Sequence, residues 1–227
     1  MREDWTDLRR IDELALNLGY PPPQPCFNSL GRAVAAPAEG FNIIDHFWDD
    51  LRRTKSAIIV GDDEDEAAAR AVEMYCIDAN LRFLHSSGDL LAQAVNASLN
   101  LGLDPKDCSL AGIISKTKDD AQLAGVHSAL VSFRDSDQFQ YIDSFVSTVK
   151  HRGALLPESH KTAITADGRF SEGWEYAAFT FETRGKNGTV RTHDATSRED
   201  TRGFGGELRE LADDVFSEVL IVLEGRL

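Results

Sequence analysis

The 227-residue sequence has few basic residues, few cysteines and no long apolar run. Lys and Arg number 24 against 38 Asp and Glu, so the formal net charge is −14. This charge argues against broad, nonspecific binding to phosphate backbones, which basic side chains drive. The three cysteines are far apart in the sequence and form no CxxC, which argues against a zinc ribbon or a disulfide framework and favours a reducing compartment. The apolar runs at 57–60 and 219–223 are too short to span a membrane, and the N-terminus does not resemble a secretory signal. We therefore expect a cytoplasmic protein with no membrane partner.

Apolar residues recur every three or four positions over most of the chain, which predicts amphipathic helices. A short first helix is expected at 4–18, and prolines with small residues predict a surface linker up to residue 40. Further helices are expected over 41–61, 64–101, 110–133, 139–156 and 204–224. The 64–101 helix carries one apolar seam formed by Ala68, Val72, Tyr75 and Ala79, and a second formed by Leu84, Leu91, Val95 and Leu99.

The period changes after residue 160. Residues 176–183 alternate apolar and polar side chains, and Asn187-Gly188 is a strong hairpin signal before a return strand at 189–193. An earlier strand is expected at 162–165, and 194–203 is expected to be a loop. The fold class is therefore mainly α: an antiparallel four- to five-helix bundle with a β-hairpin inserted before the C-terminal helix. The expected division is an N-terminal helix with a Pro-rich linker at 1–40, and a bundle domain at 41–227 with the hairpin at about 161–193.

Common nucleophile and phosphate-loop motifs are missing, including GxSxG and HExxH. The Gly-rich segment 203–206 is expected to open the last helix, where it is either an ordinary turn or a weak anion site. The acidic run 62–66 is expected to occupy a helix N-terminus, where carboxylates meet unpaired N–H groups; a metal or basic-partner site is the alternative.

Four histidines fall one on each of four predicted helices: His46, His85, His127 and His151. Facing inward together, they could ligate a metal in the bundle core. None is three or four residues from another His or a Glu, the spacing that places two ligands on one helix face. No metal ligand is therefore assigned, and no cofactor is expected.

A polar stripe follows one face of the 64–101 helix. Its members are spaced three or four apart: Asp78, Arg82, His85, Asp89, Gln93, Asn96 and Asn100. Such a face is either solvated or lines a polar groove between helices. Asp78 and Arg82 are spaced as an i, i+4 ion pair. His85 and Asp89 are the candidate groove residues.

The triplet Lys150-His151-Arg152 lies near the end of the 139–156 helix. Lys150 and Arg152 are candidate phosphate-binding residues, and His151 with Arg152 is the candidate catalytic pair, His151 acting as acid or base. The structural alternative is that basic side chains stabilise the negative end of the helix dipole or extend from a core seam to solvent.

Two segments carry a family resemblance: FLHSSGDLLAQAVN at 83–96 and YIDSFVSTVKHRGAL at 141–155. They resemble helical bundles of the HEPN superfamily, in particular bacterial members whose last bundle helix ends in a Lys-His-Arg triplet. Many HEPN proteins are RNases of toxin–antitoxin or defence systems. Their motif is an Arg, four to six residues and a His, usually at a dimer interface. No His in this sequence follows an Arg at that spacing, so the resemblance implies only a basic spot at His151 and Arg152.

Three functions follow as expectations. The first is a HEPN-like cytoplasmic helical-bundle protein linked to RNA metabolism, stress or defence, with RNA or protein partners and a homodimeric state. The second is a noncatalytic acidic module that binds a protein partner. The third is a metal-binding helical bundle.

Overall fold

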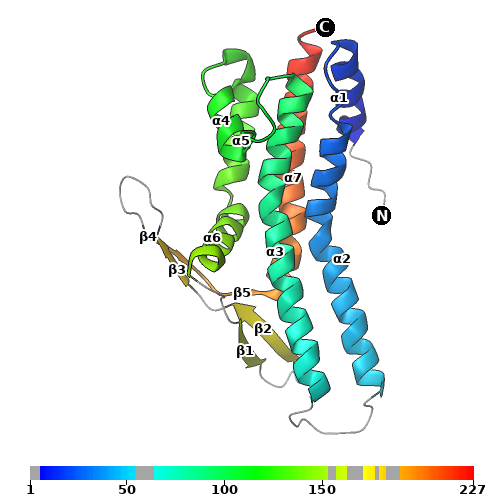
Figure 1. Cartoon of the computed structure of the whole chain (residues 1–227), viewed down its shortest axis with the longest axis vertical. Coiled ribbons are helices and arrows are strands. Elements are labelled where there is room, and N and C mark those ends of the chain that lie inside the picture. The colour runs from blue at the N-terminus through cyan, green and yellow to red at the C-terminus, as the bar shows by residue number, and fades with distance from the viewer. Residues whose placement is uncertain (1–5, 55–63, 153–156, 163–170, 177–178, 183–189) are drawn as a thin grey trace. The chain divides into compact units, whose positions relative to one another are not determined.

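The computed structural model describes residues 6–54, 64–152, 157–162, 171–176, 179–182 and 190–227, and it is mainly α-helical (Figure 1). The helices are α1 (Thr6–Asn17), α2 (Gln24–Thr54), α3 (Glu64–Leu99), α4 (Leu110–Thr117), α5 (Ala124–Asp135), α6 (Asp137–Arg152) and α7 (Arg198–Glu224), with a 3₁₀ turn η1 (Ala121–Leu123) before α5. The predicted mainly α, bundle-like fold is confirmed. In the described part of the chain, no helix combines the length and the apolar character needed to cross a membrane.

The chain divides into two compact units, each built from separate stretches of sequence. The first unit comprises residues 1–35, 83–140 and 206–227, and the second comprises 36–82 and 141–205. Helices α2, α3, α6 and α7 therefore each contribute one part to each unit. The predicted domain division at residue 40 remains a prediction.

The first unit is held together by an apolar core shared by its helices. Phe27 of α2 packs edge-on against Phe216 of α7, with the ring centroids 5.2 Å apart. On α1, Arg10 forms an ion pair with Glu224 of α7 at 2.7 Å. The seam predicted for the second half of α3 is fully buried here: Leu84, Leu91, Val95 and Leu99. Periodicity alone therefore predicted which face of this helix packs inward.

In the second unit, α2 lies close to α3 at Gly40. A Cβ atom added to Gly40 would lie 3.0 Å from both the Oδ1 and Nδ2 atoms of Asn80, which is itself buried. The absent side chain at Gly40 thus lets α2 approach the Asn80 amide. Near this contact, Arg202 of α7 forms an ion pair with Asp45 at 2.6 Å, and its guanidinium lies 5.4 Å from the centroid of the Phe41 ring. These contacts connect α2 to both α3 and α7 within the unit.

The second unit also contains the β structure, as five strands in the described residues. Strand β1 (Pro157–Thr162) pairs antiparallel with β2 (Ser171–Tyr176), which pairs antiparallel with β5 (Thr196–Ser197). Strand β3 (Phe179–Glu182) pairs antiparallel with β4 (Val190–His193) in a separate two-stranded sheet, with Phe179 opposite His193. The predicted hairpin strands are confirmed in part: β3 and β4 lie within 176–183 and 189–193, but Tyr176 is the last residue of β2. The predicted Asn187-Gly188 turn lies outside the described residues.

The strand predicted at 162–165 is misplaced, because β1 begins at Pro157 and ends at Thr162. Strand β1 pairs with β2 alone among the described strands. An edge strand tolerates a proline and polar residues, so β1 lacks the apolar alternation that predicts a strand.

The Pro-rich linker predicted up to residue 40 is wrong from Gln24 onward. These residues form the first half of α2, and the carbonyl of Pro23 accepts hydrogen bonds from the backbone N–H groups of Cys26 and Phe27. Prolines are compatible with a first helical turn, where N–H groups have no helical partner. The small residues in this stretch are mostly alanines, which have the highest helix propensity. Pro37 is accommodated inside the helix.

The single helix predicted over 110–133 is also wrong, because α4 and α5 are separate. Helix α4 ends at Thr117, and the carboxylate of Asp120 accepts the backbone N–H of Gln122 at 2.9 Å to begin the 3₁₀ turn. A short acidic side chain that bonds to the nearby backbone competes with helix continuation. Apolar spacing did not reveal this break, because buried residues continue on both sides of it.

The loop predicted over 194–203 is wrong as well. Strand β5 and the start of α7 at Arg198 occupy most of it. The Gly-rich segment 203–206 therefore lies inside α7 and does not open the helix. The anion site considered for that segment required a helix N-terminus, so this interpretation is withdrawn.

Candidate functional site

The two predicted groove residues lie on the part of α3 that belongs to the first unit. Asp89 Oδ1 accepts a hydrogen bond from the backbone N–H of Leu110, 3.2 Å away, at the start of α4. The ring of His85 lies parallel to that of Phe139 on α6, with centroids 6.4 Å apart. A carboxylate at a helix N-terminus and an imidazole stacked on a phenyl ring both stabilise the fold. Their role in a functional groove remains a prediction.

The start of α4 shows how Asp89 acts as an interhelical cap. Ser109 is the N-cap residue, and its hydroxyl accepts the N–H of Gly112 at 3.1 Å. Asp89 supplies a second acceptor, for Leu110, from a different helix. Two of the N–H groups that a helix start leaves unpaired are therefore satisfied by side chains. The carboxylate that made Asp89 a candidate site residue here forms a hydrogen bond that joins α3 to α4.

The remaining stripe residues divide between an ion pair and a loop anchor. Arg82 Nε lies 2.8 Å from Asp78 Oδ2, as the spacing predicted. The Asn96 amide accepts the N–H of Leu103 and donates to its carbonyl, each at 3.0 Å. Asn100 follows the end of α3 with a φ of 50°, in the left-handed region that Asn tolerates well. Near its C-terminal end the stripe therefore fixes the chain that leaves α3.

His127 also forms a specific contact within the first unit. Its Nδ1 lies 3.1 Å from the carbonyl oxygen of Ile114 and 3.3 Å from the hydroxyl of Thr117. Since a carbonyl oxygen only accepts, Nδ1 carries the proton in the bond to Ile114. This imidazole binds the C-terminal end of α4 and ties it to α5. Across the described part of the chain, no group of three His, Cys, Asp or Glu residues is placed to hold a metal ion.

The basic triplet falls at the C-terminal end of α6, which is described up to Arg152. Lys150 is exposed to solvent. The side chains of His151 and Arg152 lie outside the described residues, so only their positions on the helix are known. Arg152 is one turn past Thr148 and two turns past Phe145, both of which are buried. The helical position of Arg152 thus continues the buried face of α6, while Lys150 is on a solvent-exposed part of the helix.

A second cluster, which the sequence analysis missed, joins α6 to β4 and α7 in the second unit. Tyr141 is 7% exposed, and its ring contacts His193 edge-on, with centroids 5.8 Å apart. The same ring lies 5.7 Å from that of Phe204 and 6.4 Å from that of Phe145. No local pattern identifies this cluster, because its members come from three elements far apart in the sequence.

The environment of His193 favours the neutral imidazole. Burial lowers the pKa of His193, the nearby positive charge of Arg191 lowers it further, and Asp194 partly opposes both. A neutral imidazole beside a phenol suits close aromatic packing, because neither ring then carries a full charge. The cluster therefore holds the β3–β4 hairpin against α6.

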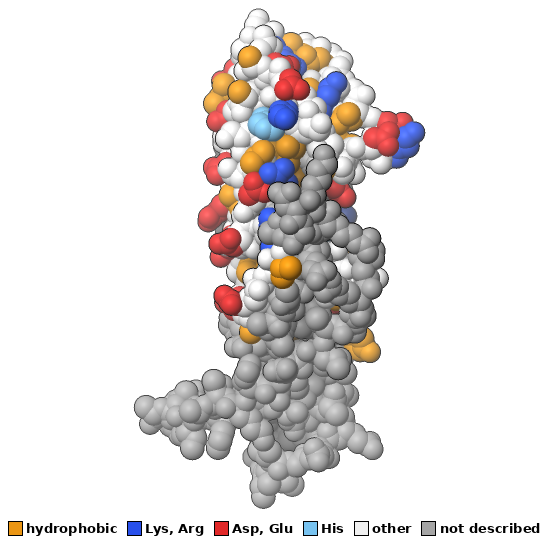
Figure 2. Space-filling model, turned by 90° about the vertical axis from the view of Figure 1, so that its left-hand side faces the viewer, with side chains coloured by type: hydrophobic (Ala, Val, Ile, Leu, Met, Phe, Trp, Pro, Cys, Tyr) orange, Lys and Arg blue, Asp and Glu red, His pale blue; other side chains and the backbone are white. Residues whose placement is uncertain are grey.

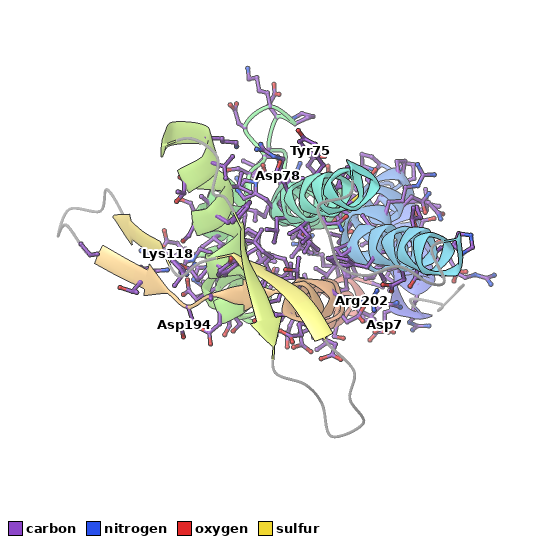
Figure 3. The ribbon with its side chains drawn as sticks, turned by 90° about the horizontal axis from the view of Figure 1, so that it is seen from below. Asp7, Tyr75, Asp78, Lys118, Asp194 and Arg202 are labelled. Atoms are coloured by element: carbon purple, nitrogen blue, oxygen red, sulfur yellow. The ribbon has the colours of Figure 1, made fainter. Side chains whose placement is uncertain are left out.

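Over the described part of the face in Figure 2, acidic, basic and apolar side chains are interspersed. Figure 3 labels Lys118, which follows α4 and is exposed, and Asp194, which follows β4 and is also exposed.

Comparisons with known proteins do not assign this chain to a family. No protein-family model matches the chain, and neither curated proteins nor solved structures give a significant match.

Proposed function

We propose that this chain is a HEPN-like helical-bundle protein that binds RNA in a stress or defence response, through Lys150, His151 and Arg152. The observation that carries the proposal is the position of the triplet in the last turn of α6. Lys and Arg side chains donate N–H groups to phosphate oxygens, and the exposed Lys150 lies in this turn. The fold supports the same reading, since the chain is a mainly α bundle, as the resemblance implies.

The other polar candidates support this choice by their contacts. Asp89 caps α4, Asn96 anchors a loop, and His127 binds the end of α4. Each of these groups already has a structural partner within the first unit. The proposal therefore uses the triplet, whose Lys150 is exposed at the end of α6.

A catalytic step on RNA is part of the same proposal. His151 exchanges a proton with the ribose hydroxyl or the leaving oxygen, and Arg152 neutralises the charge that develops on the phosphate. A histidine is suited to this step because its ordinary pKa lies near neutrality.

The test separates binding from cleavage. Fluorescence anisotropy with a labelled single-stranded RNA oligonucleotide measures binding, and gel analysis of the same RNA measures cleavage. Lys150→Ala/Arg152→Ala is expected to weaken binding about tenfold at low salt, because two phosphate contacts are lost. His151→Ala is expected to abolish cleavage and retain binding.

The matched control is Lys116→Ala/Lys118→Ala, which removes the same charge from the end of α4. It is expected to leave RNA affinity within about twofold of wild type. Equal losses in the two double variants would show a general charge effect and overturn the proposed site. Absence of RNA binding by the wild-type protein would overturn the RNA-binding function itself.

A second candidate is a noncatalytic acidic module that binds a basic protein partner. The observation that favours it is the group of carboxylates around Asp213 on α7. Asp213 is exposed; partial burial raises its pKa, Arg209 opposes this, and the charges of Asp7, Asp214 and Glu210 add smaller increases. A basic partner would relieve this repulsion. Binding of a Lys-rich peptide that Asp213→Asn weakens, together with no RNA binding by wild type, would favour this candidate.

We also propose a cytoplasmic location and a homodimeric state. Cys26, Cys76 and Cys108 are thiols and not disulfides, as a reducing compartment favours. The homodimer is the assembly in which the resemblance places HEPN sites. Sedimentation of the purified protein tests it directly.

A further inference from the structure

Buried polar side chains differ between the two units in the partners they have. In the first unit, Ser87, Ser98 and Thr117 are buried, and each donates a hydrogen bond to a backbone carbonyl of its own helix. Asn80 of α3 lies in the second unit and is 5% exposed, yet its Nδ2 atom has no hydrogen-bond partner in the part of the chain that the structure describes. A buried N–H group without an acceptor is costly, so this amide requires an acceptor that the described residues do not supply.

A second donor of the same kind adjoins the same stretch of α2. Arg202 of α7, labelled in Figure 3, forms an ion pair with Asp45 through Nη2, and its guanidinium lies 5.4 Å from the centroid of the Phe41 ring. Its Nε atom is buried and has no hydrogen-bond partner among the described residues. The Asn80 amide lies against Gly40, the residue before Phe41. Donors from α3 and α7 therefore adjoin consecutive residues of α2.

The charge and the packing at this junction determine which ligand fits the two donors. Arg202 is already paired with Asp45, so a further anion would gain little attraction and would be repelled by the carboxylate. The helices approach closely, since a Cβ atom at Gly40 would lie 3.0 Å from both polar atoms of the Asn80 amide. Such packing leaves room only for a very small molecule. Water is small and neutral, and its oxygen accepts hydrogen bonds from N–H groups.

We infer that water is bound inside the second unit at the junction of α2, α3 and α7, where it accepts hydrogen bonds from Asn80 Nδ2 and Arg202 Nε. Internal waters typically make about three hydrogen bonds to buried groups that would otherwise be unsatisfied, and they are costly to remove. The bound water thus helps to hold the three helices together. This inference goes beyond the proposed RNA binding and does not depend on it.

The test is NMR spectroscopy of the nitrogen-15-labelled chain. Asn80→Leu identifies the side-chain amide signals of Asn80 by their loss, and Asn80→Asp serves the same purpose if circular dichroism shows that the Leu variant is unfolded. A long-lived internal water gives cross-peaks to nearby protons that have opposite signs in laboratory-frame and rotating-frame NOE spectra, whereas proton exchange gives the same sign in both. We expect water cross-peaks of opposite sign at the Nδ2 protons of Asn80.

Asn96 provides the matched control, because it is an amide on the same helix. Its Nδ2 atom donates to the Leu103 carbonyl at 3.0 Å, so its protons are expected to show no such pair of cross-peaks. Missing cross-peaks at Asn80, or equal ones at Asn80 and Asn96, would overturn the inference. Shifts of the Asn80 signals on addition of sodium acetate or phosphate, without shifts at Asn96, would show that the acceptor is an anion and would also overturn it.

Discussion

Replacing Asn96 with Ala tests the interpretation that the polar stripe of α3 anchors the loop after the helix. The Asn96 side chain accepts the N–H of Leu103 and donates to its carbonyl, with both distances 3.0 Å and the contacts partly buried. Each bond contributes about 1 kcal/mol to the free energy of unfolding, so the loss of two costs about 2 kcal/mol. Ala is a better helix former than Asn by about 0.5 kcal/mol, which opposes the loss. We therefore expect Asn96→Ala to lower the free energy of unfolding by about 1.5 kcal/mol.

Urea unfolding followed by circular dichroism measures this change, and a drop in Tm of about 3–6 °C should accompany it. Gln93→Ala is the matched control, because Gln93 lies one turn earlier on the same stripe and makes no side-chain hydrogen bond within the described residues. Asn96→Asp is expected to fall between the two, since a carboxylate still accepts the Leu103 N–H but cannot donate to its carbonyl. Equal stability of Asn96→Ala and Gln93→Ala would refute the loop-anchor interpretation.

Three further predictions follow from individual contacts. Gly88→Ala should lower the free energy of unfolding by about 1–3 kcal/mol, because the new Cβ would lie 2.7 Å from Cζ of Phe139. The control is Gly31→Ala, which should be neutral or stabilising, because a Cβ at Gly31 would have no atom within 4 Å. Burial lowers the pKa of His193, so the unfolded chain takes up a proton at a higher pH than the folded chain. The contribution of His193 to the free energy of unfolding is thus complete above pH 6.5 and is lost as the pH falls below it. His193→Gln should flatten the fall in the free energy of unfolding that urea unfolding measures between about pH 7.5 and 5.5. An unchanged slope of stability against pH would contradict this. Partial burial raises the pKa of Asp213, Arg209 opposes this and neighbouring carboxylates add to it, while the exposure of the side chain screens all three. Asp213→Asn should therefore raise the urea midpoint at pH 7 slightly and have little effect at about pH 3, and a lower midpoint at pH 7 would count against this.

Helices buried on one periodic face were predictable from the sequence. On α7, Leu208, Val215 and Val219 are fully buried as their spacing indicated, and the same holds for the second half of α3. Apolar spacing did not predict where local turn residues break a helix. The Asp120 cap that separates α4 from α5 interrupts the hydrogen bonds of the helix and leaves the apolar spacing intact, so periodicity could not detect it.

Contacts between residues far apart in the sequence could not be predicted from local sequence patterns. His193 and Tyr141 meet because the register of β4 and the buried face of α6 coincide, and neither element alone indicates the other. The stripe on α3 was predicted as one polar face, yet Asp89 and Asn96 are committed to backbone groups that follow the helix. The spacing identified which residues share a face but not what lies opposite them.

The salt dependence of RNA binding tests the central claim, that the end of α6 holds phosphate, most directly. For single-stranded RNA, each neutralised phosphate contributes about −0.7 to the slope of log affinity against log salt concentration. The wild-type slope should therefore be steeper than that of Lys150→Ala/Arg152→Ala by about 1.4, since two phosphate contacts are lost. Identical slopes for the two proteins would contradict the claim that these side chains bind phosphate.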